Sequence, residues 1–146
     1  MFKTSQQAYR SQGALGFATV AGTSADVTGS AIDRMQVTSG QQGYQAARAI
    51  LTTGLISGTA GAYARLVCED SSTGTDGWAA LVDPATGTQY VSGTIGTAAV
   101  TSIGVDLSRA KQFVRFTAEI TATGTTTLLV GCGVDLLGAF VQPAGS

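Results

Sequence analysis

The chain has 146 residues, enough for one domain with its own hydrophobic core, and contains no apolar run long enough to span a membrane. Only 12% of the residues are charged and the formal net charge is −1, so the chain offers no basic field to attract a nucleic acid. Histidine is absent, which removes the commonest general base and the commonest metal ligand.

Residues 1–12 differ from the rest of the chain because they are polar and lack glycine. Phe2, Ala8 and Tyr9 could share one face of a short helix. We therefore predict an N-terminal arm over residues 1–12 and a single domain over residues 13–146. The arm is either a frayed terminus or a segment that grips a neighbouring subunit.

From residue 13 onward, glycine, threonine, serine and valine recur in short blocks, and the chain has 20 glycines in all. This mixture disfavours helices and suits strands separated by turns. The first strands are expected at residues 16–20 and 26–37. Residues 45–56 could form a helix or a strand, and we favour a strand because Thr52, Thr53 and Gly54 follow the alanines and no N-cap box precedes them.

The middle of the chain alternates strands and turns. In residues 62–69, Tyr63, Arg65 and Val67 alternate with smaller or apolar residues, which predicts a strand. A polar loop over residues 69–77 follows, then a strand at 78–82. The sequence of residues 83–87, with aspartate first, proline second and glycine last, is typical of a type I turn. Partner strands are expected at 88–91 and 98–107.

The clearest strand is predicted at residues 111–121, where Val114, Phe116, Ala118 and Ile120 share one face. Phe113 lies on the opposite, charged face, so we expect a neighbouring element or subunit to cover it. A turn at 122–125 and a strand at 126–134 follow, and we predict that the two strands form an antiparallel hairpin. The glycines of the second strand indicate a bulge or a close approach by a neighbour.

These patterns predict an all-β fold: a single-domain antiparallel β-sandwich or jelly roll with a short N-terminal arm. Strands do not alternate with helices, which argues against a parallel α/β sheet. Cys68 and Cys132 each lie within an apolar stretch, so we expect both to be free, buried thiols.

The sequence contains no pattern typical of catalytic, cofactor-binding or metal-binding residues, so we predict no enzyme activity and no cofactor. A Ser-Lys site would need Lys3, in the arm, or Lys111, on a charged strand face. The adjacent acids Glu69 and Asp70 face opposite ways on a strand, which does not suit a glycosidase. Trp78 could line a sugar site, as could Tyr90 and Tyr63, although core or interface roles explain these aromatics better.

Two further motifs are weak. The oxygen-rich loop at residues 69–76 lacks the spacing of a calcium loop and is expected to be a solvated turn. Gly131, Gly133 and Gly138 imitate a dinucleotide-binding loop, but the third glycine falls too late and no helix follows. What remains is a surface of threonine, alanine and glycine that can pack against other subunits without burying ions, which predicts an interface-rich structural protein.

One stretch resembles a known family. It contains Gly104 to Ser108, then Lys111 to Phe116, then a Thr/Gly turn and the apolar residues 128–137. This pattern is similar to small head proteins of tailed bacteriophages, and the resemblance extends to their jelly-roll capsid decoration (cement) proteins. The resemblance covers the C-terminal third of the chain. In the remainder, only the general mixture of residue types is similar.

The resemblance implies a virion protein on the capsid exterior, assembled in the host cytoplasm. Its partners would be the major capsid protein and itself, as a homodimer or homotrimer, with no nucleic acid and no membrane. Its work would be to bridge and stabilise major capsid subunits, with residues 1–12 reaching a neighbour. The alternatives are another virion component of the head–tail or fibre type, and a carbohydrate-binding β-sandwich module.

Overall fold

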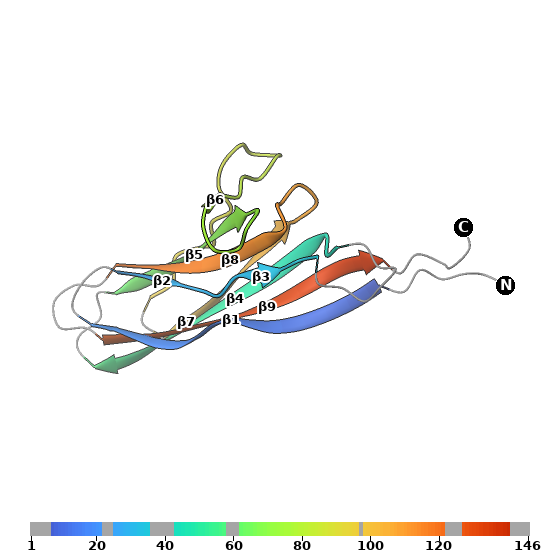
Figure 1. Cartoon of the computed structure of the whole chain (residues 1–146). Helices are drawn as coiled ribbons and strands as arrows, with labels where there is room; N and C mark the ends of the chain where they lie inside the picture. The colour runs from blue at the N-terminus through green and yellow to red at the C-terminus, as the bar shows by residue number, and fades with distance from the viewer. Residues whose placement is uncertain are drawn as a thin grey trace, which may run out of the picture.

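The protein is known from a computed structural model, in which residues 7–21, 25–35, 43–57, 62–96, 98–121 and 127–140 are described. Their strands form two antiparallel sheets packed face to face, and Figure 1 shows the two layers running along the length of the molecule. These residues contain no helix. The prediction of a single-domain, all-β sandwich is therefore confirmed.

Each sheet has four main strands in its path. Sheet A has the order β1 (Gln7–Ala21), β9 (Thr127–Phe140), β4 (Ala46–Ser57) and β7 (Ala99–Asp106). Sheet B has the order β2 (Ala25–Thr28), β8 (Phe113–Thr121), β5 (Tyr63–Ser71) and β6 (Ala79–Ala80), and β3 (Ile32–Asp33) also pairs with β8. All connections except β2–β3 and β5–β6 cross from one sheet to the other. With β2 and β3 together filling one strand position, this order is that of a jelly roll.

The core lies between the sheets because alternate residues of each strand point inward. Phe116 and Val114 of β8 are fully buried, as are Leu66 of β5 and Leu128 of β9. The two-residue alternation predicted for these three strands is confirmed. The inward rows of β5, β8 and β9 consist of Ala64, Leu66 and Cys68; Val114, Phe116, Ala118 and Ile120; and Leu128, Val130, Cys132, Val134 and Leu136.

The strand preferred for residues 45–56 is confirmed as β4, the third strand of sheet A. Its alanines have helix propensity, but β4 is hydrogen-bonded to β9 on one side and to β7 on the other. Ala47, Ala49 and Leu51 fall on its buried face. Pairing on both edges and burial of one face therefore override the local preference.

The predicted hairpin of residues 111–121 with 126–134 is wrong. β8 lies in sheet B, where it pairs with β2, β3 and β5, whereas β9 lies in sheet A between β1 and β4. Both strands bury one face, but against each other across the core and not side by side. The predicted turn at residues 122–125 lies outside the described residues.

The helix considered for the N-terminal arm is also wrong over residues 7–12, because these residues belong to β1. Gln7 pairs with Phe140 and Gln12 with Val134, with one register shift between Ala8 and Arg10, and the same strand runs on across the predicted arm boundary to Ala21. Residues 1–6 lie outside the described part. The register of β1 against β9 shifts at three places, and two of these shifts, between Gly13 and Ala18, lie opposite the glycines of β9, where the sequence predicted a bulge or a close approach.

The open edge of sheet B is an interrupted strand. β6 covers only the end of β5, the chain then turns back at residues 82–89, and residues 90–95 resume the pairing through Val91 opposite Val67 and Ile95 opposite Ala64. The predicted strands at 78–82 and 88–91 are thus reduced to β6 and single bridges. The turn at residues 83–87 is confirmed: Thr86 and Gly87 donate to the Asp83 carbonyl, and Gly87 has a φ of 73°.

Candidate interaction surfaces

The outer face of sheet B carries paired charges. Arg65 lies directly opposite Glu119, with 2.6 Å between Nε and Oε2, and Arg115 lies directly opposite Glu69 at 2.8 Å. The four residues share one face because outward positions of β5 and β8 recur at every second residue, and the register between the two strands places them opposite each other. All four side chains are partly exposed, so each pair contributes no more than about 1 kcal/mol to stability. Their main effect is a strongly polar, charge-balanced face.

Two of the three aromatic residues considered for sugar binding have other roles. The guanidinium of Arg115 lies 4.3 Å from the centre of the Trp78 ring, a cation–π contact that occupies one face of that ring. The Tyr90 ring packs against the core, and its hydroxyl accepts a hydrogen bond from the Asp106 backbone N–H at 3.3 Å. Trp78 thus belongs to the ion-pair cluster on sheet B, and Tyr90 ties the edge of sheet B to β7.

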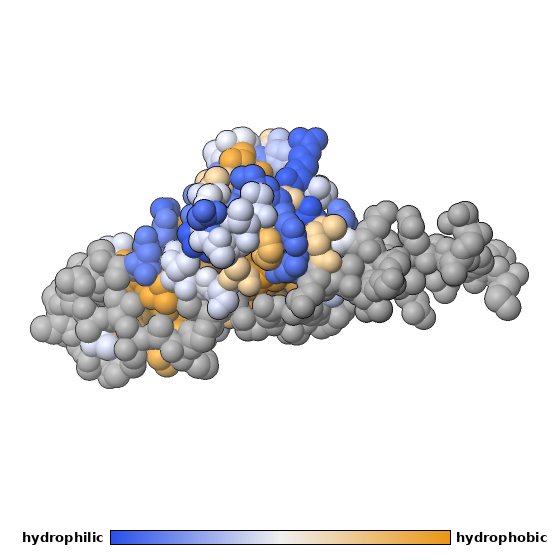
Figure 2. Space-filling view, viewed as in Figure 1, coloured by the Kyte–Doolittle hydropathy of each residue, from blue (hydrophilic) through white to orange (hydrophobic). Residues whose placement is uncertain are grey.

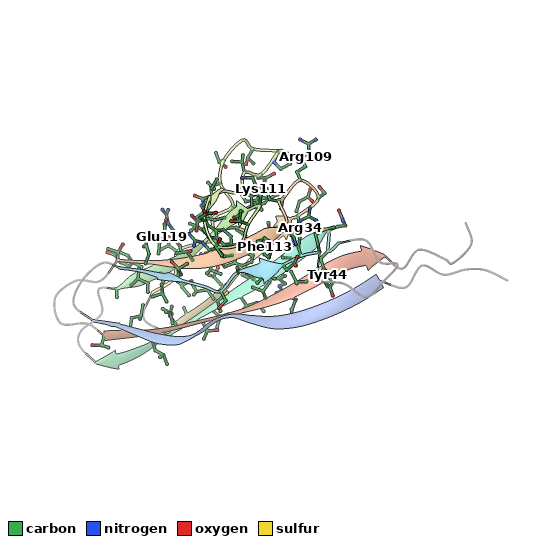
Figure 3. All side chains as sticks on the ribbon, in the orientation of Figure 1. Arg34, Tyr44, Arg109, Lys111, Phe113 and Glu119 are labelled. Carbon is green, nitrogen blue, oxygen red and sulfur yellow. The ribbon has the colours of Figure 1, made fainter. Side chains whose placement is uncertain are left out.

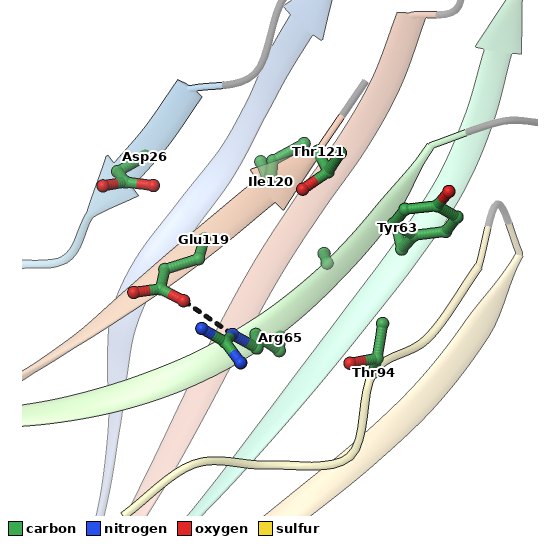
Figure 4. A pocket seen from close by; sticks show the side chains of 8 residues that line it. Asp26, Tyr63, Arg65, Thr94, Glu119, Ile120 and Thr121 are labelled. Carbon is green, nitrogen blue, oxygen red and sulfur yellow. Dashed lines mark hydrogen bonds and ion pairs between the residues drawn. The ribbon is translucent and has the colours of Figure 1, made fainter. Parts of the chain in front are cut away.

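Tyr63 is the aromatic residue that borders a hollow. Its side chain is 47% exposed at the start of β5, beside Arg65 and Glu119. Asp26 of β2 is in register with Glu119, so one row across three strands presents two carboxylates and a guanidinium (Figure 4). The hollow has a volume of about 570 Å³, and its lining consists of Asp26, Tyr63, Ala64, Arg65, Thr94, Glu119, Ile120 and Thr121.

The residues considered for catalysis do not converge. Glu69 is bound to Arg115, whereas Asp70 is almost buried and accepts the Lys111 backbone N–H at 3.0 Å. The Lys111 ammonium lies 3.4 Å from the same Asp70 carboxylate, which engages the lysine that a Ser-Lys site would need. The structure gives no position for Lys3, since residues 1–6 lie outside its described part.

The oxygen-rich loop after β5 satisfies its own polar groups. The Thr73 hydroxyl donates to the Asp76 carboxylate at 2.6 Å and accepts the Asp76 N–H at 3.2 Å. Ser71 is fully buried and accepts the Thr73 and Gly74 N–H groups at 3.1 Å each. Across the described segments no three acidic or cysteine side chains gather as metal ligands.

The same loop covers Phe113, as the sequence predicted. A Cβ on Gly74 would lie 2.9 Å from the Phe113 ring, and Gly74 has a φ of 78°, so glycine is required there for two reasons. Figure 3 shows Phe113 beside this upper group of loops. Its exposed position on a charged strand face is therefore explained within the chain, without a second subunit.

The outer face of sheet A is different in chemistry. On β4, β7 and β9, whose side chains the structure describes from residue 46 to 54, 99 to 106 and 127 to 138, the charged outward residues are Arg48 and Asp135, opposite each other in register, and Asp106. The remaining outward positions on β4, β7 and β9 are small or neutral. They are Ala46, Ile50, Thr52, Gly54, Val100, Ser102, Gly104, Leu129, Gly131, Gly133 and Leu137.

The polar character of the sheet B side can be followed in Figure 2. Figure 2 shows mainly hydrophilic residues over the loops around β6 and the adjoining part of sheet B. The ion pairs Arg65–Glu119 and Arg115–Glu69 lie on this side of the molecule. Where side chains are described, sheet A therefore presents the less charged outer surface and sheet B the more charged one.

Both cysteines are free and buried, as the sequence predicted. Burial raises the pKa of the Cys68 thiol far above its ordinary value, with Asp70 and Glu69 adding to the effect. Burial also raises the pKa of Cys132 to about 11. Because the thiolate is the nucleophile, neither sulfur is reactive at neutral pH.

A scan of the chain against protein-family models found no match, and a search of curated proteins found no similar protein. Within the described residues no helix has the length and hydropathy needed to cross a membrane. The two outer faces and the hollow on sheet B are thus the features from which a function can be inferred.

Proposed function

We propose that this protein is a structural subunit of a virus particle, a decoration (cement) protein on the capsid of a tailed bacteriophage. It binds the major capsid protein on the capsid exterior, bridges neighbouring capsid subunits and associates with itself as a homodimer or homotrimer. It is assembled in the host cytoplasm. It performs no catalysis, and it binds neither nucleic acid nor membrane.

The observation that supports this proposal is the charge-poor outer face formed by the described side chains of β4, β7 and β9 in sheet A. Burying an unpaired charge in an interface costs several kcal/mol, whereas burying glycine, threonine and small apolar residues does not. Arg48 and Asp135 face each other across β4 and β9, so they can enter an interface as a pair. Sheet A is therefore the face suited to a broad contact with another protein.

The resemblance in sequence indicates that the partner is the major capsid protein. The segment with Gly104 to Ser108 and Lys111 to Phe116, followed by the apolar residues 128–137, is similar to the head proteins of tailed phages. In the fold this segment comprises the end of β7, the first part of β8 and most of β9. It therefore contributes to both sheets of the jelly roll.

Capsid binding can be tested on shells assembled from the major capsid protein encoded in the same genome. Gly133→Arg places a charged side chain on sheet A, where a Cβ meets no atom within 4 Å and the backbone φ is not positive. The variant should therefore fold but fail to co-sediment with the shells. Gly96→Arg is the matched control, because a Cβ at Gly96 also meets nothing within 4 Å and this residue lies off sheet A.

Two results would contradict the proposed binding to the capsid. If the wild-type protein stays in the supernatant at concentrations that saturate other decoration proteins, the proposed partner is wrong. If Gly133→Arg and Gly96→Arg both co-sediment fully, sheet A is not the binding face. Deleting residues 1–6, which leaves β1 whole, tests the arm separately: loss of binding is expected if the arm grips a neighbour.

A second candidate function is favoured by the hollow on sheet B. Tyr63 can stack on a sugar ring while Arg65, Glu119 and Asp26 bind its hydroxyl groups. A carbohydrate-binding protein should then lose its glycan-array signal on Tyr63→Ala and keep it on Trp78→Ala, since Trp78 is held by Arg115. An array without signal for the wild-type protein would remove this candidate.

A further inference from the structure

The open edge of β7 has unpaired backbone groups in its centre. The Leu107 N–H donates to the Gln45 carbonyl toward β4, whereas the Asp106 N–H points the other way and donates to the Tyr90 hydroxyl. Backbone groups alternate in direction along a strand, so those of Val100, Ser102 and Gly104 also point away from β4. Within the described residues these three have no hydrogen-bond partner on that side.

This edge lacks the usual protection against pairing. Natural edge strands are blunted by lysine, proline, bulges or covering segments. β7 has none of the first three: its eight residues pair with β4 without a register shift, and its one charge, Asp106, is at the end. Tyr90 covers the edge at Asp106 and leaves the centre open.

We infer that β7 pairs antiparallel with β7 of a second copy of this chain, about a two-fold axis at Ser102. Val100 then pairs with Gly104 of the second copy, Ser102 with Ser102, and Gly104 with Val100. Three reciprocal pairs with two hydrogen bonds each give six hydrogen bonds. Sheet A continues through the axis as one sheet of eight strands.

The side chains support this register. Val100 is 64% exposed, more than any other large hydrophobic residue in the described part of the chain. Gly104 has no reason within its own chain to be glycine, because a Cβ there meets nothing within 4 Å and its φ is not positive. In the dimer the large side chain of one copy lies beside the small residue of the other, which explains both features.

The charges support the same partner. Across the axis, Asp106 pairs with Ala98 of the second copy, so the two aspartates lie at opposite ends of the ribbon and do not repel each other. Strand pairing of this length buries less than the roughly 1,600 Å² of a standard stable interface. A dimer that dissociates on dilution is therefore expected. This inference specifies the self-association in the proposed function, but capsid binding by sheet A does not depend on it.

The test is the mass of the isolated protein in solution, measured by sedimentation over a hundredfold range of concentration. The wild-type mass should double from the dilute to the concentrated end. Ser102→Pro removes the central free N–H, which β4 does not use, and should stay monomeric, whereas Ser102→Ala keeps the N–H and should dimerise like the wild type. Gly104→Lys keeps every backbone group and should also stay monomeric, and it serves as the second variant if the proline prevents folding.

Hydrogen exchange gives an independent readout. In the dimer, the amides of Val100, Ser102 and Gly104 should be protected, and dilution should release them while Thr101 and Ile103 stay protected by β4. A wild-type protein that is monomeric throughout, or trimeric, overturns the inference, as does equal dimerisation by Gly104→Lys. Because these measurements use the isolated protein, they fail or succeed separately from co-sedimentation with capsid shells.

Discussion

Arg34 links the connection between β3 and β4, in which it lies, to the connection between β7 and β8. Its Nε donates to the carbonyls of Ala110 at 3.1 Å and Lys111 at 2.8 Å. Nη2 donates to Ala110 at 2.6 Å, and Nη1 donates to the Tyr44 carbonyl at 3.3 Å. Figure 3 shows Arg34 between Tyr44 and the loop that carries Lys111. We predict that Arg34→Met destabilises the protein, because methionine keeps the length of the stem but leaves three carbonyls without their donor.

The magnitude follows from the number of carbonyls. A hydrogen bond contributes about 1 kcal/mol after exchange with water, so three carbonyls give about 3 kcal/mol. Arg34 is partly exposed, and burial lowers the pKa of its guanidinium, which means that its own desolvation offsets some of this gain. We therefore expect a decrease of about 2–3 kcal/mol in the free energy of unfolding. Arg34→Lys should recover little of it, since an ammonium cannot reach three carbonyls with the geometry of a guanidinium.

The assay is equilibrium unfolding in urea, followed by circular dichroism at one fixed protein concentration. Arg65→Met is the matched control, because its guanidinium is half-exposed and makes one ion pair, with Glu119. The control should lose less than about 1 kcal/mol. If Arg34→Met and Arg65→Met unfold at the same urea concentration, the claim that Arg34 holds the loops together is wrong.

Three other predictions concern the core, the thiols and a turn. Phe116→Ala should lower the free energy of unfolding by about 3–5 kcal/mol in the same urea assay, because Phe116 is the largest fully buried side chain among the described residues. At pH 8, Cys68 and Cys132 should not react with a thiol reagent in the native protein, because both thiols stay protonated below their raised pKa values. In urea both cysteines should react within minutes. Rapid labelling of the native protein would contradict their burial. Gly87→Ala should cost about 1 kcal/mol in thermal unfolding, because its φ is 73°, whereas Gly104→Ala should change stability by less than about 0.5 kcal/mol.

The candidate surfaces were only partly visible in the sequence. Alternation along residues 111–121 and 62–69 identified which residues of β5 and β8 face outward, and hence that Arg65, Arg115 and Glu119 are on the surface. It could not show that Arg65 lies opposite Glu119, because cross-strand neighbours depend on register. Tyr63 was one of three aromatics considered for sugar binding, and only the packing of β2, β5 and β8 places it at a hollow.

Arg34 could not be found from the sequence at all. It lies in a turn after β3, and its partners are separated from it by as many as 77 residues along the chain. Its donors bind backbone carbonyls, which every residue has, so no residue type at the other end of the bond marks the contact. The same reasoning applies to the open edge of β7, since whether an edge is open depends on which strands take the neighbouring positions.

The sequence by itself determined the strand class of the fold and, for the longer strands such as β5 and β8, which residues face inward. A period of two, with glycine and proline turns between the blocks, specifies strands with one buried side, because side chains alternate along an extended backbone. Only the tertiary structure decided that β8 and β9 oppose each other across the core and do not form a hairpin. Each strand buries its apolar row equally well in either arrangement, so the choice depends on contacts between residues far apart in the chain.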